Sequence, residues 1–229
     1  MSTSSKGPAL LEIRDAAKTF TQGDEEITAL HPTDLTIHAG EFIAILGPSG
    51  SGKSTLLTIM GGLRTPSQGE VTIGGEEFST LPEKKRARVR HSRIGFILQA
   101  ASLVPFLKVE DQFLLHDRVA RSRSDLKRRD ELLEALGIAK YRQSYPGDLS
   151  GGERQRTAIA VALYHDPDLI LADEPTAALD TRRAMDVAQI LAEQTHERAK
   201  ATVMVTHDER LTKVCDRILV MEDGKLTER

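Results

Sequence analysis

Four short, almost uninterrupted apolar runs are spaced along the chain, and each ends abruptly at a chemically capable residue. They span residues 42–46, 94–98, 169–172 and 202–206, which is strand length. Segments with apolar residues three and four apart, as in amphipathic helices, lie between them. Strands without polar alternation, separated by helices, are typical of a parallel sheet that is buried on both faces. The pattern therefore predicts an α/β fold.

The clearest helical periodicity lies in the middle of the chain. It covers residues 109–120, 124–136 and 151–164. Gly137 follows the second of these segments directly and is expected to end that helix as a C-terminal cap. The longest apolar runs are of strand length, so no segment is expected to span a bilayer.

We expect a single domain of 229 residues with two lobes. A catalytic lobe takes residues from about 10–99 and again from about 166–226, and an inserted helical subdomain takes about 100–165. Residues 1–8 are rich in Ser and Thr, and we expect them to be disordered. They lack the apolar core of a signal peptide, so we expect the protein to stay in the cytoplasm.

A Gly/Ser-rich stretch follows the first apolar run and opens a helix-compatible segment at 56–63. It consists of Gly47, Pro48, Ser49, Gly50, Ser51, Gly52, Lys53, Ser54 and Thr55. Glycines at these positions let backbone N–H groups turn toward a polyphosphate, Lys53 adds a point charge, and the Ser54 hydroxyl can reach Mg²⁺. The helix that follows directs the positive end of its dipole at the same anion. A flexible turn would explain the glycines but not the whole pattern, so we predict nucleotide binding.

A second Ser/Gly-rich motif stands at residues 149–156, immediately before a helical segment. It contains Ser150, Gly151, Gly152 and Glu153. Ser150 is placed as a helix cap, and the two glycines expose N–H groups, which makes a second helix N-terminus suited to an anion. Taken alone, the motif is also compatible with an ordinary helix start.

The residues at the strand ends form a possible catalytic set. Gln99, Asp173, Glu174 and His207 each follow one of the apolar runs, and ligands of parallel sheets bind beyond the carboxyl ends of the strands. We expect these side chains to converge on phosphates held by Lys53. Such a cluster can support attack of water on a γ-phosphoryl group.

Each member of this set has an expected role. Asp173, with Ser54 and Gln99, is the candidate Mg²⁺ partner. Glu174, held extended by the following Pro175, is the candidate general base. His207 can donate a hydrogen bond to the γ-phosphate.

The order of these motifs resembles the nucleotide-binding domain of ABC transporters, over about residues 10–226. The resemblance implies a P-loop NTPase (RecA-like) core with a parallel-rich sheet, an N-terminal antiparallel β region and an inserted α-helical subdomain. It also implies ATP and Mg²⁺ as cofactors, an adenine-stacking role for Phe20, and a D-loop that includes Asp180. In this family two copies pack head to tail, so Ser150, Gly151 and Gly152 of one copy would bind the ATP held by the other.

Residues 61–63 and 69–71 resemble the ATPases of lipoprotein-release and macrolide-export (LolD- and MacB-like) systems. Residues 95–109 and 223–227 resemble the haem-exporting (HrtA-type) ATPases of Gram-positive bacteria. This implies an ATP hydrolase that drives haem efflux with a separate permease, at the cytoplasmic face of the membrane. Alternatives are a non-transporting envelope or cell-division complex and export of a lipoprotein, macrolide or peptide. A third alternative, a soluble ATPase acting on DNA or ribosomes, usually needs a longer chain.

An apolar patch directly after Gln99 is the candidate permease-docking segment. It is made of Leu103, Val104, Pro105, Phe106 and Leu107. Burial of these side chains inside the helical lobe is the alternative reading. The family resemblance favours docking of a short helix of the permease.

Composition changes this picture little. Hydrophobic residues make up 39% and charged residues 28%, which is ordinary for a globular protein. Two basic stretches stand out: Lys84, Lys85, Arg86, Arg88, Arg90 and Arg93, and Arg118, Arg121, Arg123, Lys127, Arg128 and Arg129. The net charge of −3 and the absence of interleaved aromatic residues argue against nucleic acid. The two basic stretches are then expected either to be solvated helix faces or to contact anionic lipid headgroups.

The single cysteine and the remaining histidines give no further site from the sequence. Cys215 is expected to pack as a small apolar group within a helix. The histidines other than His207 show no metal-ligand spacing, so any haem is expected to bind the permease and not this chain.

Overall fold

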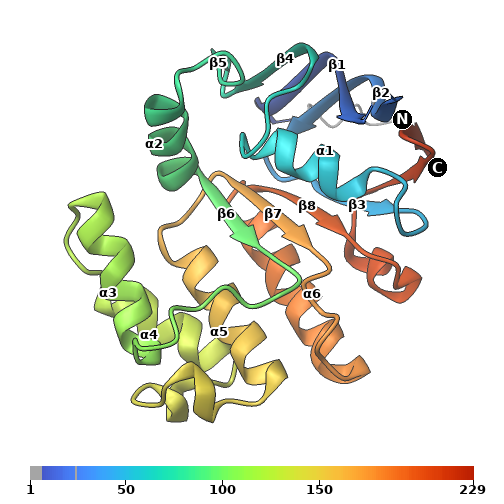
Figure 1. Ribbon diagram of the computed structural model, residues 1–229. Helices are drawn as coiled ribbons and strands as arrows, with labels where there is room; N and C mark the ends of the chain where they lie inside the picture. Colours follow the sequence, from blue (N-terminus) through green and yellow to red (C-terminus); the bar gives the residue numbers. More distant parts are fainter. Residues whose placement is uncertain (1–6, 24) are drawn as a thin grey trace.

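The computed structural model describes residues 7–23 and 25–229. Two β-sheets and a set of helices form layers, with the smaller sheet over one face of the larger sheet and most of the helices on the opposite face (Figure 1). The prediction of disorder for residues 1–8 concerns mainly 1–6, which lie outside the described residues.

The larger sheet contains the four predicted strands and two more. Its strands are β3 (Phe42–Leu46), β6 (Ile94–Ile97), β7 (Leu169–Asp173), β8 (Ala201–Val205), β9 (Arg217–Glu222) and β10 (Lys225–Glu228). Their spatial order is β10-β9-β3-β8-β7-β6. All neighbours are parallel except β10, which pairs antiparallel with β9. The predicted parallel sheet is confirmed. Strands β6 and β8 end one residue earlier than predicted, so Leu98 and Thr206 lie just after them.

The uninterrupted apolar runs follow from burial on both faces of this sheet. In β3, Ile43 and Ile45 belong to one hydrophobic cluster, while Phe42 packs into another on the opposite face. In β7, Leu169 and Leu171 alternate in the same way with Ile170 and Ala172. Since successive strand residues point to opposite faces, a strand covered on both sides needs apolar residues at every position.

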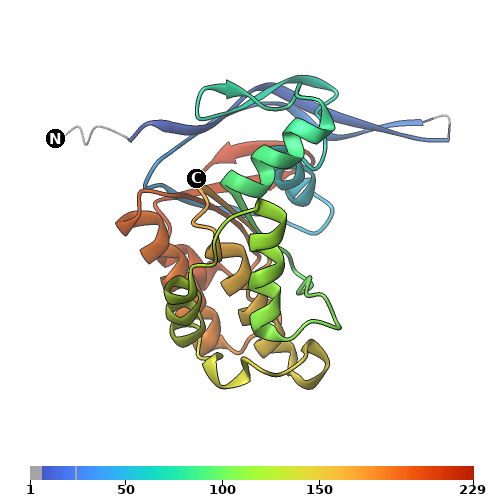
Figure 2. The ribbon, with the colours of Figure 1, turned by 90° about the vertical axis from the view of Figure 1, so that its left-hand side faces the viewer.

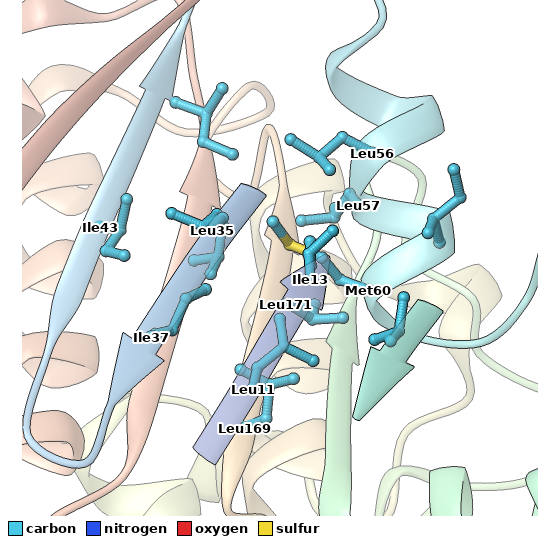
Figure 3. Packing of buried hydrophobic residues seen from close by; sticks show 14 of the residues in the cluster. Leu11, Ile13, Leu35, Ile37, Ile43, Leu56, Leu57, Met60, Leu169 and Leu171 are labelled. Atoms are coloured by element: carbon cyan, nitrogen blue, oxygen red, sulfur yellow. The ribbon is translucent and has the colours of Figure 1, made fainter. Parts of the chain in front are cut away.

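The smaller sheet covers one face of the larger one. It consists of β1 (Ala9–Gln22), β2 (Glu25–His38), β4 (Gln68–Ile73) and β5 (Glu76–Glu77), all antiparallel, in the order β2-β1-β4-β5. Helix α1 (Lys53–Met60) contributes apolar side chains to the core shared by the sheets. Figure 3 shows Leu56, Leu57 and Met60 of α1 beside Leu11 and Ile13 of β1. This packing fixes the start of α1, and with it the loop before it.

The other helices are α2 (Glu83–Arg93), α3 (Val109–Ala120), α4 (Leu126–Ala135), α5 (Gly151–Tyr164) and α6 (Thr181–Glu197), with short 3₁₀ helices at Ala139–Tyr141, Pro146–Asp148 and Glu209–Val214. Helices α3 and α5 have the predicted bounds. Helix α4 begins later than expected because the Asp125 side chain caps it, accepting a hydrogen bond from the Arg128 N–H over 2.9 Å. Gly137 adopts a φ of 63°, as a residue that ends a helix requires.

Figure 2 shows α2 above α3, with both helices facing the viewer. The described structure places α3, α4 and α5 against a hydrophobic cluster that is separate from the one under the smaller sheet. The proposed division into a catalytic lobe and a helical subdomain is compatible with this arrangement and stays a prediction.

One local prediction was wrong. Cys215 does not lie inside a helix but directly follows the 3₁₀ helix Glu209–Val214 in extended conformation. It still packs against a hydrophobic cluster, as expected. Burial raises the pKa of its thiol to about 12, so the side chain stays a neutral apolar group. Nowhere in residues 7–23 and 25–229 is there a helix that is long and apolar enough to cross a membrane.

Candidate functional site

The Gly/Ser-rich loop joins the end of β3 to the start of α1, as predicted. Two of its glycines are required by close backbone approaches. A Cβ on Gly47, where φ is 147°, would lie 2.1 Å from the Met221 carbonyl oxygen, and a Cβ on Gly52, where φ is 105°, would lie 2.4 Å from the Ala29 carbonyl oxygen. The loop is therefore packed closely against the backbones of β9 and β2, which leaves it one path.

Lys53 is the first residue of α1 and is only 9% exposed. Its ammonium group donates hydrogen bonds to the carbonyl oxygens of Gly47 and Pro48, over 2.7 and 2.6 Å. The side chain thus folds back over its own loop. The positive charge is held where the loop's backbone N–H groups can face the same anion.

A cavity of about 450 Å³ lies beside this loop. Its lining consists of Ala29, Ser49, Gly50, Gly52, Lys53, Ser54, Thr55, Gln99, Asp173, Glu174, Val205 and His207. The fold therefore brings the strand-end residues together with the loop, as the parallel topology predicted. Ala29 and Val205 were missed, because an apolar lining residue carries no chemical signal in a sequence.

Ser54 and Asp173 are in direct contact across the cavity. The Ser54 hydroxyl donates a hydrogen bond to the Asp173 carboxylate, with an Oγ to Oδ2 distance of 2.8 Å. A hydroxyl, a carboxylate and the nearby Gln99 amide form a set of hard oxygen donors. Mg²⁺ in nucleotide sites takes one or two such protein ligands and completes its shell with phosphate and water. The residues present fit that ion, and the described residues hold no larger metal-binding cluster of His, Cys, Asp and Glu.

Glu174 and His207 also contact each other. The His207 Nδ1 lies 2.9 Å from the Glu174 Oε1, and the Glu174 side chain is 15% exposed against 75% for His207. A nearly buried carboxylate beside an exposed imidazole is a suitable pair for orienting water and for donating a hydrogen bond to a phosphate.

The prediction that Pro175 holds Glu174 extended was wrong. Glu174 adopts a φ of 47°, in the left-handed region that non-glycine residues rarely occupy. Its N–H donates to the Val205 carbonyl oxygen over 3.0 Å, and its own carbonyl oxygen accepts from Ala177 over 3.2 Å. These two bonds impose a turn directly after β7. The turn overrides the local preference of a residue before proline.

The second Gly/Ser motif starts α5 with a reciprocal cap. Ser150 accepts a hydrogen bond from the Glu153 N–H over 3.4 Å, and Glu153 accepts one from the Ser150 N–H over 2.8 Å. Glu153 also accepts a hydrogen bond from the Tyr141 hydroxyl. That bond, with those from Ser150, lowers the pKa of Glu153 to about 2. Glu153 is therefore fixed within its own chain, and Tyr141, which sequence reasoning missed, supports the motif from a separate turn.

Several predicted site residues do not line the cavity. Ser150, Gly151 and Gly152 lie elsewhere in the same chain, with Ser150 and Gly151 exposed. Asp180 caps α6, accepting from the Arg183 N–H over 3.0 Å. The cationic groups of Lys18 and Arg64 lie over the Phe20 ring, at 5.5 and 5.3 Å from its centroid. The roles expected of these residues stay predictions.

One contact joins the second motif to the segment before Gln99. The side-chain amide of Gln155 donates a hydrogen bond to the Leu98 carbonyl oxygen over 3.0 Å, and Gln155 is 1% exposed. Helix α5 is thus tied to the backbone that carries Gln99 into the cavity. The sequence places both residues in motifs but gives no sign that they touch.

The apolar patch after Gln99 forms a turn that is held by a buried glutamine. The Gln112 side chain accepts from the Val104 N–H and donates to the carbonyl oxygens of Val104 and Leu107, over 3.1, 2.9 and 3.0 Å. Phe106, at the tip, is 76% exposed. Leu103 lines a groove of about 550 Å³ that also contains Phe96 and Leu98. The patch is therefore not buried as a whole.

Comparisons with known proteins agree with one another. The family described as "ABC transporter" matches residues 30–177. The chain is 40% identical over 221 residues to the lipoprotein-releasing system ATP-binding protein LolD 1 of Rhodopseudomonas palustris, covering 95% of this chain and 98% of the relative. It is 42% identical over 218 residues to the hemin import ATP-binding protein HrtA of Staphylococcus epidermidis, covering 94% and 98%.

A solved structure has the same fold. The dimeric ATP-binding cassette MJ0796, in a post-hydrolysis state bound to ADP and Pi, superimposes with a TM-score of 0.89. The sequence identity is 35%, and the match covers 96% of this chain and 98% of the cassette. MJ0796 is a protein of Methanocaldococcus jannaschii.

Proposed function

This chain belongs to the ABC transporter family of ATP-binding subunits, and from that membership we propose that it is the ATPase subunit of a membrane exporter whose spanning part is a separate permease. ATP hydrolysis coupled to transport is the activity of the family, with ATP and Mg²⁺ as its cofactors. The observation that carries the proposal is the convergence of Lys53, Ser54, Asp173, Glu174 and His207 on one cavity.

In the proposed mechanism the loop residues bind and orient the nucleotide. The Lys53 ammonium leaves carbonyl oxygens of its own loop to contact the outer phosphates, while the N–H groups at the start of α1 face the same charge. Ser54, Asp173 and Gln99 would hold Mg²⁺, which neutralises charge on the phosphates when bound. Phe20 would stack on the adenine ring.

Glu174 is the proposed general base. Its carboxylate accepts a proton from the water that attacks the γ-phosphoryl group. Because the side chain is largely buried, few other water molecules can contact the carboxylate. His207 keeps Glu174 oriented through the contact with its Nδ1 and presents the other ring nitrogen to the γ-phosphate. Asp180, at the start of α6, would act across the dimer.

We further propose that two copies form an ATP sandwich. Ser150 and Gly151 are exposed and lie outside the cavity of their own chain, so they are free to contact a nucleotide held by another copy. The relative MJ0796 was solved as a dimer with ADP and Pi. A twofold arrangement would complete both sites at once.

The proposed permease contact is the turn that carries Phe106. Gln112 fixes this turn, so the exposed ring is presented without the entropic cost of ordering a loop. Glu in place of Phe106 should prevent complex formation at the cytoplasmic face of the membrane, while ATP hydrolysis by the isolated subunit persists. Leu115→Glu is the control, since Leu115 is another exposed apolar residue, 39% accessible, on the following helix. Co-purification that survives Phe106→Glu would refute this docking site.

The proposed cargo is haem, moved outward. Support comes from the resemblance of residues 95–109 to haem-exporting ATPases and from the HrtA relative, although the name of that relative refers to hemin import. Lipoprotein release is the second candidate, because a LolD protein is similarly close.

Growth of a deletion strain on hemin separates these possibilities. Complementation with the unaltered chain, but not with Glu174→Gln, should restore hemin tolerance and lower cell-associated haem. Lower haem in the deletion strain would instead indicate import. Unchanged hemin tolerance together with mislocalised lipoproteins would replace haem by lipoprotein as the cargo.

A further inference from the structure

The two basic stretches noted in the sequence come together in the folded chain. Arg88 of α2, Arg121 and Arg123 after α3, Arg128 of α4 and Arg198 after α6 line one groove of about 1150 Å³. Figure 2 shows α2 above α3, on the face turned toward the viewer. None of the cationic side chains lines the nucleotide cavity. Segments far apart in the sequence therefore build one positive surface away from the ATPase site.

Most of these arginines have no carboxylate partner among the described residues. Arg88, Arg121 and Arg123 are exposed and form no ion pair within residues 7–23 and 25–229. Arg128 is 9% exposed, donates to the Gln194 side chain over 2.6 Å, and leaves its Nε without a partner. Burial, and then the nearby charge of Arg198, lower the pKa of Arg128, while Asp166, Glu131 and Asp125 raise it.

The carboxylates of the groove are already used. Asp117 accepts a hydrogen bond from the Tyr164 hydroxyl over 2.9 Å, and Asp125 caps α4. Asp166 forms ion pairs with Arg198 and with Lys200, at 3.4 and 3.1 Å. The groove keeps an excess of positive charge, because the five arginines face only these three aspartates.

The histidines of the groove do not form a metal site. His91, His116 and His165 stack with ring centroids 4.2 and 4.5 Å apart and planes inclined by 21° and 20°. Ring lone pairs lie in the ring planes, so stacked rings do not direct them at a common point. Burial lowers the pKa of His165 to about 4, and the ring is therefore neutral at pH 7. The charge of the groove comes from its arginines.

Exposed apolar side chains stand beside this charge. Val119 lines the groove and is 62% exposed, and Leu126, at the start of α4, is 54% exposed. Apolar groups next to unpaired guanidinium groups suit an amphiphile better than a free anion. Guanidinium groups bind phosphate through paired N–H donors.

We propose that this groove binds the phosphate headgroup of an anionic membrane lipid, with Val119 and Leu126 against the apolar part of the membrane surface. The arginines supply bidentate contacts to the phosphate, and the groove steadies the subunit at the bilayer independently of its permease. The inference does not depend on the cargo and does not use the nucleotide site.

Vesicle flotation of the purified chain tests the proposal. The chain should float with vesicles of phosphatidylglycerol and phosphatidylcholine, but not with phosphatidylcholine alone, and less so as salt is raised. Reversing Arg88 and Arg123 together to Glu should weaken binding by about tenfold or more, given the contribution of each basic residue near an anionic surface. ATP hydrolysis and the melting temperature of this variant should stay unchanged.

The matched control carries the same change of charge at two positions of α2, the helix of Arg88, outside the groove. Lys84→Glu with Lys85→Glu lies on α2 but does not line the groove. If this control lost as much vesicle binding, the binding would depend on the overall surface charge and not on the groove, and the proposal would be overturned. Displacement by millimolar glycerol phosphate, together with full binding of Val119→Ser, would assign the groove to a soluble phosphate and overturn the lipid assignment.

Discussion

The Glu174 carboxylate and the His207 imidazole are in contact, with 2.9 Å between Oε1 and Nδ1. They come from the ends of β7 and β8, which are neighbours in the sheet. The sharp turn at Glu174, with its positive φ, directs the carboxylate back toward the loop of Lys53. Strain of this kind is typically kept where the surrounding structure and the function require it.

Replacing Glu174 by Gln tests the general base. The amide keeps the size of the side chain and can still accept a hydrogen bond from His207, but it cannot take a proton from water. We expect kcat to fall by about 10²–10⁴-fold, with ATP affinity retained. Single-turnover hydrolysis and nucleotide titration measure the two quantities. Brisk turnover by this variant would contradict the assignment.

Mixing two inactive variants tests the sandwich. Lys53→Ala disables a chain's own loop, and Ser150→Arg disables the motif that it lends to its partner. In a head-to-tail dimer of one chain of each kind, one of the two sites consists only of unaltered residues. A one-to-one mixture should recover up to about a quarter of the unaltered activity, since half of randomly formed dimers are mixed. No recovery in a mixture that demonstrably forms mixed dimers would exclude this geometry.

The stacked histidines predict an acid-sensitive stability. Burial lowers the pKa of His165 to about 4, below the value of about 6.5 expected in the unfolded chain. As the pH falls from about 6.5 to 4, the unfolded chain takes up a proton that the folded chain does not. The free energy of unfolding should therefore decrease across this window, by up to about 3 kcal/mol.

Urea unfolding at several pH values measures this dependence. His165→Phe keeps an aromatic ring beside His116 but removes the titrating group, so its stability should vary less with pH over the same range. Burial also lowers the pKa of His116, so part of the slope should remain. An identical slope in the variant would show that His165 does not titrate as described.

Gln155→Leu tests the link between α5 and the segment that carries Gln99. The change leaves the Leu98 carbonyl oxygen without its donor, which should cost about 1 kcal/mol of stability. We expect a severalfold lower kcat and an unchanged KM for ATP, because the loop of Lys53 is not touched. Gln143→Leu, at an exposed position of the helical region, is the control. Equal kinetics for the two variants would show that Gln155 does not position the segment that carries Gln99.

Much of the fold follows from the sequence because local patterns determine it. Uninterrupted apolar runs predict strands buried on both faces, and the parallel topology then places Asp173 and His207 at one edge. The glycines of the loop form a complete motif in the sequence, and that motif predicts the loop in which they adopt a positive φ.

Other features depend on contacts between distant residues, which no periodicity encodes. The turn at Glu174 is imposed by a bond to Val205, against the preference set by Pro175. Cys215 leaves the helical conformation as the chain turns toward β9. The links from Tyr141 to Glu153 and from Gln155 to Leu98, and the stack of histidines, join segments far apart in the chain.

The cap at the start of α5 has a consequence for how a second copy would be recognised. While the Ser150 oxygen accepts from the Glu153 N–H, the hydroxyl proton remains available to donate outward. Tyr141 holds Glu153 in place from behind, so the serine is preorganised before any partner arrives. Little conformational freedom would then be lost at the moment of association, and most of the binding energy of the shared nucleotide could serve to hold the two copies together.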